Sequence, residues 1–238
     1  MFARRIFVVA IVAGIVAGGF VTIVQAVKIW PLIAAAEVYE KAGEAATVSG
    51  EHAGHDHGTA SAAASNWEPA DGPERILLTL LANLLVAVGF GLLLSAGFAL
   101  RDAYGGTPAN VASGVCWGMA GFAAFQLAPA FGLPPEPPGA VAAELLARQS
   151  WWAATALATA SGIALIVFVE RKVWRLVGIA AAAVPHIVGA PLPEHAGGSA
   201  PPELAAQFVA VSLVTAALFW LVLGGFGGWL YGRLSRSA

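Results

Sequence analysis

The stretch "ILLTLLANLLVAVGFGLLLSAGFAL" (76–100) contains no charged side chain, and it carries a single amide, Asn83. A helix crosses the hydrocarbon core of a membrane with about 20 apolar residues, so this stretch predicts a transmembrane helix. The whole chain has 238 residues, of which 58% are hydrophobic and 11% are charged. Because about a quarter of the residues in a soluble domain are charged, we expect lipid to cover much of the surface.

Apolar runs of this kind recur along the chain and are the main evidence for the fold. They cover residues 6–27, 76–100, 111–131, 151–169, 173–189 and 208–231. The run 173–189 is the shortest, and it contains Arg175 and Pro185. We predict an all-α, polytopic membrane protein of about six transmembrane helices. It would form a single permease domain over residues 1–238, with a long external loop at 28–75 after the first helix.

The first run could also be a signal peptide, because two arginines precede it and "VQA" (24–26) resembles a cleavage site. Its apolar stretch is longer than is usual for a signal peptide. The small residues Ala10, Gly14 and Gly18 also recur every four positions, which suits close helix packing in lipid. We therefore expect a retained transmembrane helix.

The distribution of charge predicts the orientation of the chain in the membrane. If both termini are cytoplasmic, eight of the twelve Lys and Arg residues lie inside, and twelve of the fourteen acids lie outside. This agrees with the excess of positive charge in cytoplasmic loops. We predict cytoplasmic termini and a periplasmic loop 28–75. Trp151, Trp152, Trp229 and Tyr231 fall near the ends of runs, where aromatic side chains serve as interfacial anchors.

The external loop 28–75 has two parts of different composition. "KIWPLIAAAEVYEKAGEAA" (28–46) predicts an amphipathic helix, in which Glu37 and Glu40 are three residues apart and share one face. "TVSGEHAGHDHGTASAAASN" (47–66) is rich in Gly, Ser and Ala. Such a composition is typical of a flexible segment.

The flexible segment carries a cluster of metal-binding side chains. These are His52, His55 and His57, together with Glu51 and Asp56. Imidazole and carboxylate groups bind divalent transition metals, and a flexible backbone lets several of them reach one ion. The cluster therefore predicts a loose metal-capture site. The alternative is a solvated polar linker without a ligand.

Polar side chains within the apolar runs mark a second group of candidates. Asn83, Gln126 and His186 each lie in an apolar run, where polar groups face the protein interior or an ion path. Pro129 and Pro185 lie close to two of them, and a proline leaves one carbonyl without its helical partner. For Asn83 and Gln126 the alternative is hydrogen bonding between helices. For His186 it is a cap on the end of a broken helix.

Several classes of function find no support in the sequence. The net charge of −2 argues against nucleic acid as a partner. The chain has no Walker, HExxH or G-x-S-x-G motif, so we predict that it is not an enzyme and that ATP-driven transport would need another subunit. The lone Cys116 cannot form an internal disulfide, and we expect it to be a buried thiol.

Several unusual strings occur together, in order, along nearly the whole chain. They are "PLIAAAEVYE" (31–40), "LLTLLANLLVAVGFGLLL" (77–94), "GMAGFAAFQLAPAFGLPPEPPG" (118–139), "ARQSWWAATALATASGIAL" (147–165), "PHIVGAP" (185–191) and "LVTAALFWLVLGGFGGWLY" (213–231). In these strings the chain resembles the CbtA family of predicted cobalt transporter subunits. The resemblance implies uptake of cobalt across the bacterial inner membrane, usually for cobalamin synthesis. It also implies a small one-span, histidine-bearing companion subunit, which is CbtB-like.

Together these observations predict a permease for a divalent transition metal. The histidine cluster with Glu51 and Asp56 would gather the ion, and Glu37, Glu40 and His186 would pass it inward. Asn83, Gln126 and Gln149 would line the path. Co²⁺ would be the transported ion, with no permanently bound cofactor. Two alternatives stay open, a nickel permease and a metal-binding scaffold that does not transport. The partners would be membrane lipid, further copies of the chain and the companion subunit.

Overall fold

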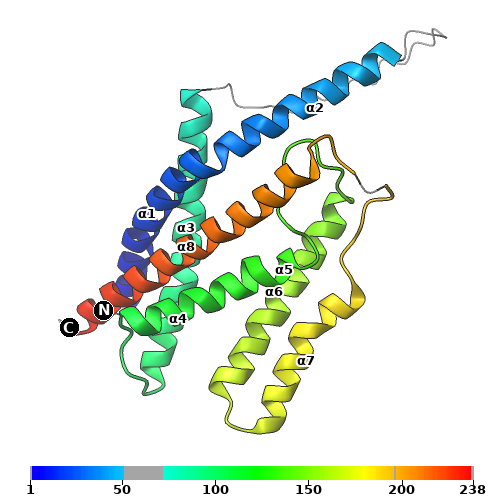
Figure 1. Cartoon of the computed structure of the whole chain (residues 1–238). Helices are drawn as coiled ribbons and strands as arrows, with labels where there is room; N and C mark the ends of the chain where they lie inside the picture. The colour runs from blue at the N-terminus through cyan, green and yellow to red at the C-terminus, as the bar shows by residue number, and fades with distance from the viewer. Residues whose placement is uncertain (1, 51–71, 196, 237–238) are drawn as a thin grey trace.

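The computed structural model describes residues 2–50, 72–195 and 197–236, and in these ranges it is built from helices (Figure 1). The elements in chain order are α1 (Phe2–Lys28), α2 (Trp30–Gly50), α3 (Pro73–Ala103), α4 (Val111–Phe122), the π-helix η1 (Ala123–Leu127), α5 (Ala128–Ala130), α6 (Leu145–Phe168), α7 (Lys172–Val188) and α8 (Pro202–Arg236). No strand is found in this part of the chain, apart from an isolated bridge between Ala140 and Gly198. The all-α prediction is therefore confirmed.

Five helical segments of the described chain are long and apolar enough to cross a membrane. They are Ala3–Lys28, Pro73–Ala103, Val111–Ala130, Leu145–Phe168 and Pro202–Arg236. Each corresponds to one of the predicted runs. The remaining run became α7, which has 17 residues and falls just short of that length. A multi-pass membrane protein is thus supported, and the count of six crossings stays a prediction.

Helix α1 packs against α3 and α8 in a bundle (Figure 1). A Cβ atom at Gly14 would lie only 2.7 Å from the Cα atom of Val88, and one at Gly18 would lie 3.0 Å from the Cα of Leu84. Only glycine permits backbones to approach this closely. The predicted role of Ala10, Gly14 and Gly18 in close packing is therefore confirmed.

Helices α4 and α8 make a second contact of the same kind. A Cβ atom at Gly114 would lie 2.9 Å from the Cα of Gly228, and one at Gly224 would lie 2.8 Å from the Cα of Gly118. The two glycine pairs, each separated by four residues, therefore face each other across the helix crossing. Large side chains fill the space around this crossing, among them the buried Trp220.

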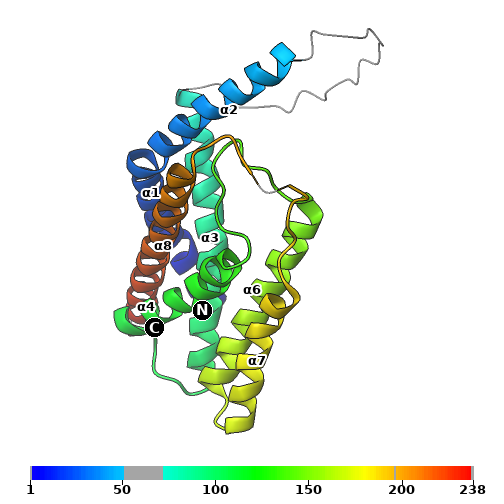
Figure 2. The same cartoon turned by 45° about the vertical axis from the view of Figure 1, so that its right-hand side comes forward.

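Helices α6 and α7 form a hairpin beside the bundle (Figure 2). A Cβ atom at Gly162 would lie 3.3 Å from the carbonyl carbon of Gly178, so the two backbones nearly touch. At the other end of the hairpin, the indole N–H of Trp151 donates a hydrogen bond of 3.1 Å to the carbonyl of Pro185. Trp151 is buried, so its predicted role as an interfacial anchor is replaced by a structural one.

The two termini lie together at one end of the bundle (Figure 1). There Arg5 contacts the Asp102 carboxylate at 3.5 Å and donates to the Ser235 hydroxyl at 2.9 Å, and the Tyr231 hydroxyl donates to Asp102 at 3.3 Å. Tyr231 is fully buried, unlike the interfacial anchor expected from its place in the sequence. The expectation for Cys116 was also wrong, because its side chain is exposed on α4.

Candidate metal-entry site

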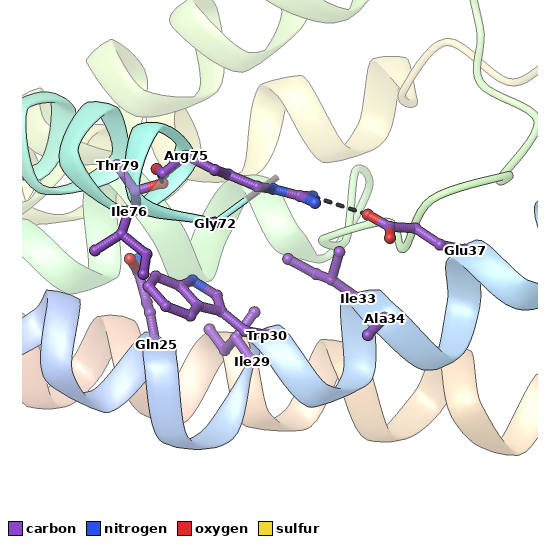
Figure 3. Close-up of a pocket in the computed structure, with 10 residues that line it drawn as sticks. All are labelled: Gln25, Ile29, Trp30, Ile33, Ala34, Glu37, Gly72, Arg75, Ile76 and Thr79. Atoms are coloured by element: carbon purple, nitrogen blue, oxygen red, sulfur yellow. Dashed lines mark hydrogen bonds and ion pairs between the residues drawn. The ribbon is translucent and has the colours of Figure 1, made fainter. Parts of the chain in front are cut away.

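A cavity of about 510 Å³ lies where α1, α2 and α3 meet, at the end of the bundle opposite the termini (Figure 3). We call it the first cavity. Its lining residues are Gln25, Ile29, Trp30, Ile33, Ala34, Glu37, Gly72, Arg75, Ile76 and Thr79. Only Ile29 separates α1 from α2, and α2 leans away from α3 as it leaves the bundle. The cavity is lined by the end of α1, the start of α2 and the start of α3.

An ion pair spans the first cavity from α2 to α3. The Nη2 atom of Arg75 lies 2.8 Å from the Oε1 atom of Glu37 (Figure 3). The two side chains are 43% and 27% exposed. Ion pairs with this much solvent access contribute about 0–1 kcal/mol. The pair therefore joins the two walls of the cavity without holding them firmly together.

A short chain of polar groups continues from the first cavity into the bundle. The amide nitrogen of Asn83 donates to Gln25 Oε1 at 2.6 Å and to Thr22 Oγ1 at 2.9 Å. Thr22 in turn donates to the carbonyl of Gly18 at 2.8 Å. Asn83 therefore makes the interhelical hydrogen bonds that the sequence left open as an alternative. It also lies one hydrogen bond away from Gln25, which lines the cavity.

Glu40 lies on the same helix as Glu37 but contacts a different part of the molecule. A Cβ atom at Gly139 would lie 3.1 Å from the Cβ of Glu40. Gly139 belongs to the loop before α6, and its carbonyl accepts a hydrogen bond of 3.1 Å from the backbone N–H of Ser199 in the loop before α8. Glu40 is not among the lining residues of the first cavity. The two glutamates therefore do not line the same cavity.

A second cavity, of about 360 Å³, lies between the π-helix, the proline-rich loop and the start of α6. Its lining residues are Gln126, Pro129, Ala130, Leu133, Pro134, Pro135, Glu136, Leu145, Arg148, Gln149 and Trp152. Two of the three predicted path residues, Gln126 and Gln149, thus share one cavity. Gln126 lies in η1, and π-helical turns are frequent at functional sites.

The second cavity also contains an ion pair and lies beside a helix cap. Arg148 Nη2 lies 2.6 Å from Glu136 Oε2. Next to this pair, the Glu144 carboxylate accepts hydrogen bonds from the backbone N–H groups of Leu146 at 2.8 Å and Ala147 at 2.7 Å. These bonds favour the ionised carboxylate and lower the pKa of Glu144.

His186 lies near the end of α7, outside both cavities. Its side chain is exposed, and its ring packs edge-on against Trp151 at 5.9 Å and Phe131 at 6.2 Å between centroids. The neighbouring carbonyl of Pro185 accepts hydrogen bonds from Trp151 and from the Gly189 N–H. Two aromatic rings thus flank this exposed imidazole, and the Pro185 carbonyl already accepts two hydrogen bonds.

The family of the chain follows from its sequence as a whole. The family model described as "Probable cobalt transporter subunit (CbtA)" matches residues 3–232. The chain belongs to the CbtA family. No curated protein and no solved structure matches it. The expected resemblance is confirmed, and both cavities, with the ion pairs that they contain, lie within the matched region.

The structure of this CbtA chain groups some of the predicted site residues and separates others. Glu37 and Asn83 belong to the first cavity and its polar extension, and Gln126 and Gln149 belong to the second. Among the described residues, no group of three or more His, Cys, Asp or Glu side chains could hold a metal ion. The candidate residues His52, His55, His57, Glu51 and Asp56 lie outside the described ranges.

Sequence reasoning missed several polar residues of the two cavities in this CbtA chain. Arg75 and Arg148 were considered only as charges that set the orientation. Gln25, at the end of an apolar run, was not considered at all. One signal was present in the sequence. Arg75 and Arg148 are two of only four basic residues on the side predicted to carry twelve acids, so each was a candidate partner for an acid.

Proposed function

We propose that the chain is the membrane subunit through which a divalent transition metal, cobalt, enters a bacterial cell. The first cavity would be its entrance. The observation that carries the proposal is the position of Glu37 in a cavity from which hydrogen-bonded amides continue inward. Carboxylate and amide oxygens suit a partly hydrated divalent cation. The family description supplies cobalt, because these ligand types do not distinguish Co²⁺ from Ni²⁺.

The proposed orientation places both termini in the cytoplasm and both cavities on the periplasmic side of the inner membrane. The excess of Lys and Arg in the loops and helix ends on the same side as the termini supports this orientation. Residues 51–71 connect α2 to Gly72, which lines the first cavity. His52, His55 and His57, with Glu51 and Asp56, would therefore gather the ion within reach of the cavity.

The remaining candidates have secondary roles in the proposal. Asn83 would act through Gln25 at the base of the first cavity, after Glu37 has taken the ion. Gln126 and Gln149 would offer a second binding space with His186 at its margin. Glu40 lines neither cavity and is assigned no role. The word "subunit" in the family description supports a companion protein. We propose the one-span, histidine-bearing subunit for this role. The alternative is a second copy of the chain.

Transport is tested with purified protein in liposomes that contain a Co²⁺-sensing dye, with and without the companion subunit. We expect Co²⁺ to enter liposomes that contain the protein and not empty liposomes. Glu37→Gln should lower the initial rate by at least about tenfold, as expected for loss of a ligand-shell group. Glu40→Gln is the matched control on the same helix. Absence of Co²⁺ entry with the companion present would rule out the transport proposal.

A second candidate function is a metal-binding scaffold that delivers ions to another permease. The contacts below the first cavity favour it. From Gly18 to Gly14, α1 lies backbone to backbone against α3, and Arg5, Asp102 and Tyr231 join the helices at the far end. In the liposome assay, a scaffold would bind Co²⁺ at the outer face and admit none, with or without the companion.

A further inference from the structure

Glu37 is the one carboxylate among the described lining residues of the first cavity, and Arg75 already occupies it. Figure 3 shows the guanidinium of Arg75 reaching across from α3 to the carboxylate on α2. A metal ion that used Glu37 as a ligand would meet a positive charge at the same oxygen. The structure therefore raises the question of how Arg75 affects binding.

We propose that Arg75 is an intramolecular competitor of the metal at Glu37. Before an ion binds, the guanidinium holds the carboxylate, and a divalent cation that binds Glu37 displaces it. When the ion leaves, Arg75 returns to the carboxylate. This inference rests on the proposed function, because it assigns the first cavity as the entry site for the metal.

The geometry favours an exchange of partners. The Arg75 side chain is 43% exposed, so its charged end can move into water when it leaves Glu37. A cavity of about 510 Å³ has room for a cation with part of its water shell. The hydroxyl of Thr79 donates to the carbonyl of Arg75 at 2.7 Å, so its oxygen lone pairs remain available beside the cavity.

A competitor of this kind solves a problem common to ion pathways. A site must bind an ion firmly enough for it to enter and weakly enough for it to leave. Binding of the ion at Glu37 must therefore be reversible. A tethered guanidinium weakens that binding without removing the ligand, because its effective concentration beside Glu37 is high.

The second cavity supplies an internal control. Glu136 and Arg148 form the same type of ion pair at 2.6 Å, but their side chains are only 30% and 28% exposed. The Nε atom of Arg148 is buried. This arginine has less access to water than Arg75, so the inference assigns it no exchange with a metal ion.

The test measures Co²⁺ binding by the purified full-length protein in detergent, with isothermal titration calorimetry. His52, His55 and His57 are changed to Ala in every sample, because these residues would otherwise bind the metal. We expect Arg75→Gln to bind Co²⁺ about fivefold more tightly than the parent, which is the upper range for loss of a competing exposed pair. Arg75→Lys should fall between them, because an ammonium lacks the planar fork of a guanidinium.

Matched carboxylate variants show whether the effect belongs to the first cavity. Glu37→Gln should weaken binding by at least about tenfold, and Arg75→Gln added to it should have no further effect. Glu40→Gln should bind within about twofold of the parent, since Glu40 lines neither cavity. Equal or weaker binding by Arg75→Gln and Arg75→Lys would overturn the inference.

Transport measurements separate this inference from the proposed function. In liposomes, Arg75→Gln should lower the Co²⁺ concentration for half-maximal uptake and also lower the maximal rate, because release becomes slower. If wild-type protein transports Co²⁺ and the Arg75 variants match it in binding and uptake, only the inference fails. If wild-type protein transports none while Arg75→Gln binds more tightly, the competitor stands and the transport proposal fails.

Discussion

Each of the two cavities contains an Arg–Glu ion pair, but the two pairs join different kinds of structural element. Glu37 and Arg75 lie 38 residues apart, on α2 and α3, so motion of one helix against the other can separate them. Glu136 and Arg148 lie 12 residues apart, in one loop and the helix that follows it. On the inference above, the pair that joins two helices can exchange partners, whereas the pair within one continuous segment stays closed.

The cavities also differ in what lies beneath them. Below the first cavity, Asn83 and Thr22 continue a hydrogen-bonded chain into the bundle. On the α6 side of the second cavity, Thr155 is buried and donates to the carbonyl of Trp151 in its own helix, at 2.8 Å. Both hydroxyls donate to a carbonyl of their own helix, so the difference is Asn83, which joins α3 to α1 below the first cavity.

The largest expected effect comes from separating the walls of the first cavity. Gly14→Leu would place a side chain where a Cβ atom already lies 2.7 Å from the backbone of Val88, so α1 and α3 must move apart. Overpacking of this kind costs about 1–3 kcal/mol. We expect a lower melting temperature in detergent and weaker Co²⁺ binding at Glu37.

Gly19 offers a matched control for this change. A Cβ atom at Gly19 would meet nothing within 4 Å, although it lies on the same helix. Gly19→Leu should keep both the melting temperature and the Co²⁺ affinity of the parent. If Gly14→Leu melts like Gly19→Leu, the close contact of α1 with α3 at Gly14 does not stabilise the protein.

Features that depend on local sequence were predicted well. The apolar runs 6–27, 76–100, 111–131, 151–169 and 208–231 all became long helices, because length and hydrophobicity suffice to predict them. The spacing of Ala10, Gly14 and Gly18 also identified a helix face in close contact with α3. A helix face that has only small residues lets another helix approach closely, and the sequence shows this face without showing which helix packs there.

Side-chain direction was predicted poorly, and the cause is physical. In a membrane helix both the lipid-facing and the protein-facing sides are apolar, so hydropathy does not show which side is buried. Tyr231 and Trp151 looked like anchors and are buried, whereas Cys116 looked buried and is exposed. The partners of Glu37 and Asn83 come from other helices. Such pairings depend on the three-dimensional arrangement, which one sequence does not reveal.

An intermediate effect is expected from the amides assigned to the two cavities. Asn83→Leu removes two hydrogen bonds between α3 and α1. Such bonds contribute about 0.6 kcal/mol each in membrane proteins, so we expect a loss of about 1 kcal/mol in stability. Uptake of Co²⁺ should also need a higher metal concentration, because Gln25 loses its partner at the base of the first cavity.

Gln149→Leu makes the corresponding change in the second cavity. Gln149 is exposed at the start of α6, so its substitution should leave the melting temperature unchanged. Thermal melting and radiolabelled Co²⁺ uptake would be measured for both variants. A greater loss of uptake in Gln149→Leu than in Asn83→Leu would move the metal route from the first cavity to the second.

The smallest effect concerns the cap that fixes α6 beside the second cavity. Backbone hydrogen bonds lower the pKa of Glu144, so its contribution to stability is fully present above the ordinary carboxylate pKa. That contribution is lost as the pH falls through the lowered pKa. Glu144→Gln should therefore melt at a slightly lower temperature than the parent at pH 7, and the difference should shrink on acidification. Glu203→Gln, in the first turn of α8, is the control. A difference in melting temperature that stays constant between pH 7 and pH 3 would show that the cap does not depend on the ionised carboxylate.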